Sequence, residues 1–153
     1  MHLSGRPGVP MSPLAGPILV VEDDPDIRDS LAGFLELQGL SVSCAANGKQ
    51  ALDALTRGPR PALVLLDMAM PIMDGHKLLN VRKASEALQE VPIVIVSAGM
   101  AVMNARDLAV YGANYGVAAF LKKPVDPRQL LEMIERHALK AAGAPAEAQP
   151  AHP

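Results

Sequence analysis

The chain has 153 residues, half of them hydrophobic, and its 14 Lys and Arg against 16 Asp and Glu give a formal net charge of −2. This length suits one domain with its own core, and the charge balance argues against a nucleic-acid or membrane surface. No membrane-spanning stretch or signal peptide is visible, and the single Cys allows no internal disulfide, so we expect a soluble, cytoplasmic protein.

The two ends of the chain differ from its middle. Residues 1–16 contain three Pro and three Gly without any hydrophobic periodicity, and residues 142–153 contain little besides Ala, Pro, Gln and Gly. Such compositions are typical of disordered tails or linkers. The sequence therefore predicts one domain over residues 17–141 with a disordered tail on each side.

Strand and helix patterns alternate five times between the tails. In chain order the predicted strands cover residues 17–22, about 40–45, 62–66, 92–97 and about 117–121. The first helix follows Asp24, a plausible N-cap with Pro25 behind it, and ends at Gly39. The second helix begins near Asn47 and ends before Gly58.

The later helices show similar signals. The third is expected to start around Asp74, and the fourth to run from about Ala101 to Tyr111, before Gly112. The last opens on Asp126, which starts a capping-box pattern. Five strand–helix units of this length predict an α/β fold, a doubly wound parallel sheet between two layers of helices.

Two of the buried strands end in carboxylates. The first runs into Glu22 and Asp23, and the third runs into Asp67. The carboxyl edge of an open parallel sheet is where such folds bind their ligands. Converging negative charges repel one another unless a divalent cation lies among them, so this pattern indicates magnesium and phosphate chemistry.

The ends of the fourth and fifth strands add two further polar groups. Ser97 ends the fourth strand, and Lys123 lies just past the fifth. Asp67 can act as a nucleophile toward phosphorus, Lys123 can neutralise a phosphoryl oxygen, and the Ser97 hydroxyl can donate a hydrogen bond to another. Asp24 could cap the first helix or add charge to the site, and the sequence does not separate these roles.

Four stretches of the chain resemble the receiver domain of two-component response regulators. They are residues 18–24, 65–75, 93–98 and 120–124, and the resemblance covers roughly residues 17–140. It implies a flavodoxin-like (βα)5 three-layer sandwich with the strand order 2-1-3-4-5. It also implies a single-domain response regulator, whose output is contact with other proteins or a phosphorelay rather than DNA binding by this chain.

The resemblance assigns roles to the residues at the sheet edge. Asp67 would accept a phosphoryl group from the phosphohistidine of a sensor histidine kinase or histidine phosphotransfer protein. Lys123 would pair with that group, and the peptide bond before Pro124 is often cis in this family. The implied ligands of Mg²⁺ are Glu22, Asp23, Asp67 and the backbone carbonyl of Ala69.

The resemblance further implies a switch that carries the signal away from the site. Ser97 would turn toward the phosphoryl group while the aromatic side chain of Phe120 swings inward. The output face would be formed by the fourth helix, the fifth strand and the last helix, and would bind a downstream target or a second copy of the chain. An apparent insertion at residues 113–116 lies on this face, and it could lengthen either the fourth helix or the loop after it.

Other readings remain open at this point. A degenerate receiver that only binds partners is disfavoured, because the chain has the full set of site residues, Asp23, Asp67, Ser97 and Lys123. A magnesium-dependent phosphohydrolase with an Asp nucleophile, like the haloacid-dehalogenase enzymes, would want a second acid two residues later, where the chain has Ala69. We expect Cys44 to be a small buried strand residue.

Overall fold

The computed structural model describes residues 13–67, 72–97, 109 and 112–141. Within these residues, no helix combines the length and the apolar character needed to cross a membrane. Residues 142–153 and most of the predicted amino-terminal tail lie outside the described part.

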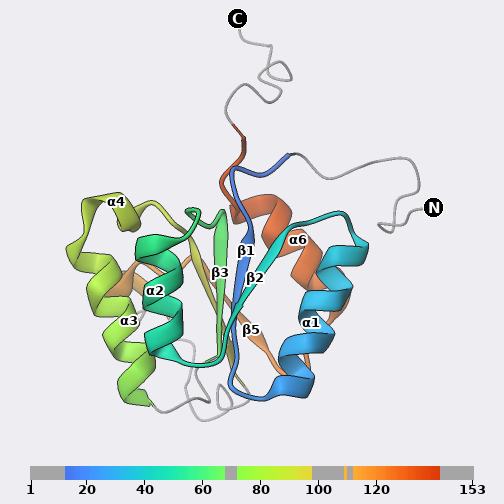
Figure 1. Cartoon of the computed structure of the whole chain (residues 1–153), viewed down its shortest axis with the longest axis horizontal. Coiled ribbons are helices and arrows are strands. Elements are labelled where there is room, and N and C mark those ends of the chain that lie inside the picture. Colours follow the sequence, from blue (N-terminus) through green and yellow to red (C-terminus); the bar gives the residue numbers. More distant parts are fainter. Residues whose placement is uncertain (1–12, 68–71, 98–108, 110–111, 142–153) are drawn as a thin grey trace, which may run out of the picture.

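The centre of the fold is a five-stranded, all-parallel sheet (Figure 1). The strands are β1 (Ile18–Val21), β2 (Val42–Ala45), β3 (Leu63–Asp67), β4 (Ile93–Ser97) and β5 (Ala119–Lys122). Their order is β2-β1-β3-β4-β5, which confirms the predicted doubly wound, flavodoxin-like topology. Every strand falls within two residues of its predicted bounds.

Helices cover both faces of the sheet, as Figure 1 shows. One layer contains α1 (Pro25–Leu37) and α6 (Pro127–His137), and the other contains α2 (Gly48–Arg57), α3 (Ile72–Ala84) and α4 (Glu86–Gln89). The sequence does not predict α4 as a separate helix, because Leu88 continues the apolar register of α3. The chain nevertheless breaks at Ser85, whose backbone is extended, with φ −111° and ψ 118°.

The core has two parts, one on each face of the sheet. Successive strand residues alternate between them, so that Ile18 and Val20 pack toward α1 and α6 while Leu19 and Val21 pack toward α2 and α3. Both sets are almost fully buried. Strands of a parallel sheet are covered on both faces, and for this reason their sequences are almost continuously apolar. Because the pleat has a period of two, it also decides which face receives the polar residue after each strand.

The predicted N-caps form as expected. The Asp24 carboxylate accepts hydrogen bonds from the backbone N–H groups of Asp26 and Ile27 at 2.9 and 3.2 Å. Asn47 caps α2 and Asp126 caps α6 in the same manner. These caps fix the direction in which each helix leaves the carboxyl edge of the sheet.

The helix before β5 continues past its predicted end at Gly112. Residues 112–115 are helical, and the turn falls at Gly116, whose φ is +69°. The Val117 N–H donates to the Gly112 carbonyl at 3.0 Å, the bond expected when a helix closes with glycine in the left-handed region. The insertion at 113–116 therefore lengthens the helix rather than the loop after it, the first of the two possibilities that the sequence leaves open.

The folded unit includes four residues before the predicted boundary at residue 17. Leu14 and Lys140 form an antiparallel bridge, in which Ala15 N–H donates to the Leu139 carbonyl and Ala141 N–H to the Pro13 carbonyl. Leu14 and Leu139 also pack against the core on the α1 and α6 side.

One residue lies differently from its prediction. Cys44 is exposed, because β2 is an edge strand with a neighbour on one side only.

Candidate functional site

The register of the strands brings the predicted site residues together. Val21 pairs with Leu66, so Glu22 and Asp67 lie at the same level of neighbouring strands. The pleat places both on the α1 and α6 side, because each follows a core residue of that side by two positions. Lys123 follows Leu121 by the same interval and so lies on the same side.

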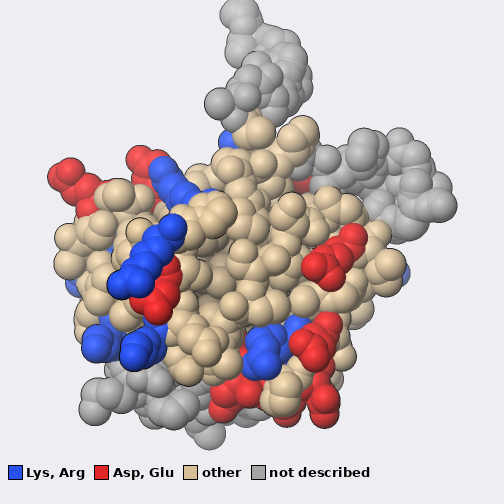
Figure 2. Space-filling model, in the orientation of Figure 1, with Lys and Arg blue, Asp and Glu red and all other residues tan. Residues whose placement is uncertain are grey.

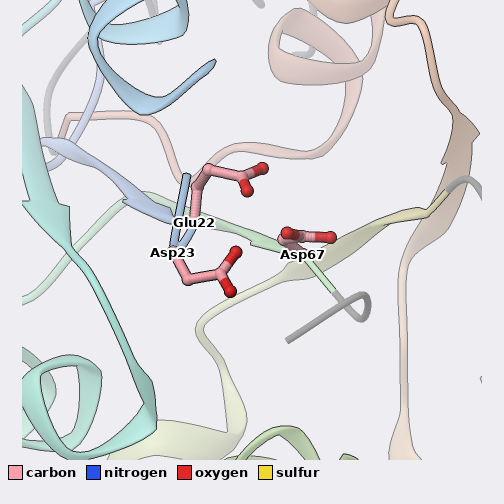
Figure 3. Close-up of side chains that lie close together, drawn as sticks. All are labelled: Glu22, Asp23 and Asp67. Atoms are coloured by element: carbon pink, nitrogen blue, oxygen red, sulfur yellow. The ribbon is translucent and has the colours of Figure 1, made fainter. Parts of the chain in front are cut away.

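Three carboxylates meet at this edge of the sheet. One ligand oxygen from each of Glu22, Asp23 and Asp67 can be chosen so that all lie within 4.8 Å of one another (Figure 3). Glu22 and Asp67 are each 2% exposed, whereas Asp23 is exposed to solvent. Two members of the cluster are thus buried, and the third reaches solvent.

Lys123 lies against the two buried carboxylates. Its Nζ is 3.1 Å from Glu22 Oε1 and 3.3 Å from Asp67 Oδ1. The Lys123–Pro124 peptide bond is cis, as the resemblance implies. One ammonium group thus serves two carboxylates, and a third carboxylate lies beside them.

The shared burial changes the acidity of the groups. Desolvation, and next to it the hydrogen bond with Asp67, raise the pKa of Glu22 to about 7, although Lys123 acts in the opposite direction. Burial disfavours the charge on Lys123, but the hydrogen bond to Glu22 and the negative charge of Asp67 outweigh it and raise its pKa above the ordinary value. Without a cation, the pocket therefore holds a proton on Glu22 into the neutral range.

Two neighbours hold the end of β1 in place. Arg28 Nη1 donates to the backbone carbonyl of Glu22 at 2.8 Å, and the Asp24 N–H donates to Glu22 Oε2 at 3.2 Å. Asp24 therefore acts through its carboxylate as the cap of α1 and through its backbone as a support for Glu22. This role of Arg28 was not predicted from the sequence. The one signal for it is that Arg28 lies one helical turn after Asp24, which directs its side chain back toward the end of β1.

Other predicted site residues are described in part or not at all. Ala69 lies outside the described residues. Ser97 ends β4 and its backbone pairs with Lys122, next to Lys123, while its side chain lies outside the described part. Phe120 pairs with Ile95 and packs against the core on the α2 and α3 side.

The donor set of the pocket suits a hard divalent cation. Carboxylate oxygens are the ligands that Mg²⁺ prefers, and three of them are already gathered here. A divalent ion would also offset the cost of burying the negative charge of Glu22, which is the main reason that its pKa is raised. Asp67 lies within reach of both the cation position and Lys123, the arrangement needed at a phosphorylated carboxylate.

The fold and site together define a class, a doubly wound α/β domain with an acidic pocket and a lysine at the carboxyl edge of its sheet. The sequence profile of the response regulator receiver domain matches residues 18–135. The chain belongs to this family, and such domains are signalling modules that interact with histidine kinases and downstream targets and bind Mg²⁺ at an acidic pocket.

Individual relatives agree with this assignment. The chain is 38% identical over 122 residues to an uncharacterized 14.6 kDa protein in the sodA1 3′ region of Leptolyngbya boryana, covering 80% of this chain and 89% of that protein. It is 37% identical over 133 residues to the response regulator Rre1 of Synechocystis, covering 86% of this chain but only 54% of Rre1. The chain thus spans about half the length of that relative.

Solved structures show the same fold. A CheY-like response regulator receiver domain protein from Methanospirillum hungatei superposes with a TM-score of 0.67 at 32% identity, covering 80% of this chain and 92% of that one.

Proposed function

We propose that this receiver domain is switched by phosphorylation of Asp67. The observation that supports it most directly is the contact of one partly buried lysine, Lys123, with two buried carboxylates, at the edge where β1 and β3 end. The donor would be a phosphohistidine on a sensor histidine kinase or a histidine phosphotransfer protein.

In the proposed reaction, a carboxylate oxygen of Asp67 attacks the phosphorus of the phosphohistidine. An O–P bond forms, the P–N bond breaks, and the imidazole leaves with the electron pair of that bond. The product is an acyl phosphate on Asp67. Lys123, already 3.3 Å from Asp67, pairs with a phosphoryl oxygen and offsets part of the added charge.

A magnesium ion would be held by Glu22, Asp23 and Asp67, with the backbone carbonyl of Ala69 as a further proposed ligand. When bound, it supplies charge neutralisation for the transferring phosphoryl oxygens. Glu22 would hold it as a carboxylate and would have to lose its proton first, so the proton would compete with the cation. Arg28 and the N–H of Asp24 keep Glu22 in position during this exchange.

The proposed output surface is the face formed by the helical stretch 112–115, β5 and α6. Ser97 would approach the phosphoryl group and Phe120 would move inward, biasing this face between two states. Ala113 and Asn114 are exposed on the lengthened helix. They give the face a feature of its own for binding a downstream protein or a second copy of the chain.

The test is to incubate the full chain with acetyl phosphate and Mg²⁺ and to measure its intact mass. We expect an acid-stable, base-labile phosphoryl adduct on the wild type and on Asp53→Asn, which removes an exposed carboxylate of α2. The adduct should be absent from Asp67→Asn. Beryllofluoride, a phosphoryl mimic, should likewise bind only where Asp67 is intact.

The same experiment distinguishes this proposal from the two alternative functions. An adduct on Asp67→Asn equal to that on the wild type would contradict the proposal. Steady release of phosphate from phosphoesters would instead favour the phosphohydrolase. No response to acetyl phosphate, beryllofluoride or a histidine kinase would indicate a domain that only binds partners.

A further inference from the structure

A buried arginine lies far from the acidic pocket. Arg82, near the end of α3, is 6% exposed, and all three of its guanidinium nitrogens donate to backbone carbonyls. Nε bonds Val91 at 2.8 Å, Nη2 bonds Gln89 at 2.8 Å and Nη1 bonds Tyr115 at 2.9 Å. The side chain thus ties α3 to the segment 89–91, which follows soon after it, and to Tyr115, which is distant in the sequence.

Among the residues that the structure describes, no carboxylate pairs with Arg82. Burial lowers the pKa of this side chain, although an arginine stays charged in a protein. A buried cation with only neutral acceptors is a costly way to fill space. An apolar side chain would fill it at lower cost, so the hydrogen bonds of Arg82 need an explanation beyond packing.

The bond to Tyr115 places this arginine at the inserted segment. The Tyr115 carbonyl lies at the end of the helical stretch 112–115, where carbonyls lack partners within a helix. At Gly116, which turns the chain toward β5, an added Cβ would lie 3.4 Å from Arg82 Nη1. Lys83 adds a second contact, with its Nζ 5.8 Å from the centre of the Tyr115 ring.

The anchored segment also contacts the aromatic residue at the switch position. A Cβ added at Gly112 would lie 3.6 Å from Cε1 of Phe120, so the ring packs directly on the start of this helical stretch. Tyr115, Val117 and Phe120 all pack against the same side of the core. Arg82 therefore bonds the carboxyl end of this helical stretch, and Phe120 packs against the same stretch one turn earlier, at Gly112.

We propose that Arg82 is a positioning residue that anchors the carboxyl end of the helical stretch 112–115 to α3. It thereby holds Phe120 in the position that this side chain has in the unphosphorylated protein. The proposal rests on the proposed function, because it concerns the two states between which phosphorylation of Asp67 would select. The anchor lies at the amino edge of the sheet, where the chain enters β4 and β5. It would act as a fixed point about which the output face rearranges.

The test uses the composition of the chain. It contains two Phe, so the full protein labelled with 4-fluorophenylalanine gives two ¹⁹F resonances, which Phe34→Leu assigns to Phe34 and Phe120. Spectra are recorded with Mg²⁺, with and without beryllofluoride, for the wild type, Arg82→Lys and Arg82→Met. Arg60→Met is the matched control, because it removes an exposed arginine paired with Glu90, directly after α4.

Without beryllofluoride, we expect the Phe120 resonance of Arg82→Met to move toward its beryllofluoride-bound position, and that of Arg82→Lys to move less far. Arg60→Met should keep the wild-type position. Acetyl phosphate should phosphorylate Arg82→Met about threefold faster or more, because a larger share of the molecules already populates the reactive state. A loss of stability alone would move neither measurement.

Each remaining outcome counts for or against a definite claim. A Phe120 resonance that stays at the wild-type position in both Arg82 variants would overturn the anchor, provided that beryllofluoride moves it in the wild type. If beryllofluoride moves no resonance of the wild type, the proposed function itself fails. If Arg82→Met does not fold, Arg82→Lys decides, since it keeps the charge while losing the three-way geometry.

Discussion

At the scale of single residues, the pocket is short of positive charge. Lys123 contacts Glu22 and Asp67 at 3.1 and 3.3 Å, yet Asp23 adds a third carboxylate to the same cluster. The imbalance is met in part by a proton, since burial and the neighbouring Asp67 raise the pKa of Glu22 to about 7. A divalent cation bound as proposed would therefore compete with this proton for the same carboxylate.

The competition predicts a pH dependence for magnesium binding. At pH 8 Glu22 is mostly ionised, whereas at pH 6 the cation must first displace its proton. With a pKa of about 7, the dissociation constant for Mg²⁺ should rise about tenfold from pH 8 to pH 6. Isothermal titration calorimetry at the two pH values, in buffers of different ionisation enthalpy, measures both the affinity and the proton released.

Glu22→Gln is the control for this prediction. It should bind Mg²⁺ more weakly at pH 8 but with a much smaller change down to pH 6, because the group that holds the proton is gone. An equal affinity of the wild type at both pH values would contradict the prediction. In the absence of Mg²⁺, the folded chain holds the Glu22 proton to a higher pH than the unfolded chain does. Its contribution therefore lowers the stability as pH rises from about 4.5 to 7.

The residues of the acidic cluster could be read from the sequence, but the buried arginine near the opposite edge of the sheet could not. Glu22, Asp67 and Lys123 lie at or just past the ends of apolar strands, and parallel strands place such residues at one edge. Arg82 shows no comparable signal, since an arginine on a helix is ordinarily exposed. Its burial depends on hydrogen bonds to the carbonyls of Gln89 and Tyr115. Only the tertiary structure brings these carbonyls to Arg82, so local sequence patterns do not reveal it.

At the scale of elements, two helices end in the same way with different surroundings. Gly39 and Gly116 both have positive φ, +87° and +69°, and both are followed by a residue whose N–H bonds back into the last helical turn. A Cβ at Gly39 would meet nothing within 4 Å, whereas one at Gly116 would lie 3.4 Å from Arg82 Nη1. A substitution at Gly39 therefore reports backbone strain alone, whereas one at Gly116 reports strain together with contact with the buried arginine.

Replacing each glycine by alanine tests this difference. Gly39→Ala should lower the free energy of unfolding by about 1–2 kcal/mol, the cost of the left-handed conformation for a residue with a Cβ. Gly116→Ala should lower it by about 1 kcal/mol more, because the methyl group also crowds the Arg82 guanidinium. Urea denaturation of both variants measures the two losses, and a smaller loss for Gly116→Ala would argue against a tight contact there.

The elements themselves were largely readable from the sequence. Asp24, Asn47 and Asp126 cap their helices because a side-chain oxygen before the first turn satisfies free N–H groups, a purely local rule. The helix end predicted at Gly112 was wrong, since Gly112 is tolerated inside the helix and Gly116 supplies the left-handed turn. Which of two nearby glycines ends a helix depends on which donors bond the carbonyls of the last turn. Here Arg82 Nη1 donates to the carbonyl of Tyr115.

At the scale of the whole molecule, the two edges of the sheet have separate tasks. The acidic pocket occupies the carboxyl edge, and Figure 2 shows acidic side chains gathered over the start of α1 at this end, where Asp23, Asp24 and Asp26 are exposed. The described chain ends meet at the opposite edge (Figure 1). The bridge between the chain ends packs on the α1 and α6 side, whereas Arg82 belongs to α3. Loss of this bridge can therefore leave the chemistry at the carboxyl edge intact.

This separation predicts the effect of shortening the chain. A protein that starts at Pro17 loses the Leu14–Lys140 bridge, the two backbone hydrogen bonds beside it and the packing of Leu14 on the core. Compared with one that starts at Pro13, we expect its free energy of unfolding to fall by about 2–4 kcal/mol, from one partly buried leucine and two hydrogen bonds. Guanidinium denaturation gives this difference, and acetyl phosphate labelling of Asp67 at 25 °C should be the same for both proteins. Equal stabilities would place the start of the folded unit at residue 17, whereas a loss of labelling in the folded, shortened chain would show that the two edges are coupled.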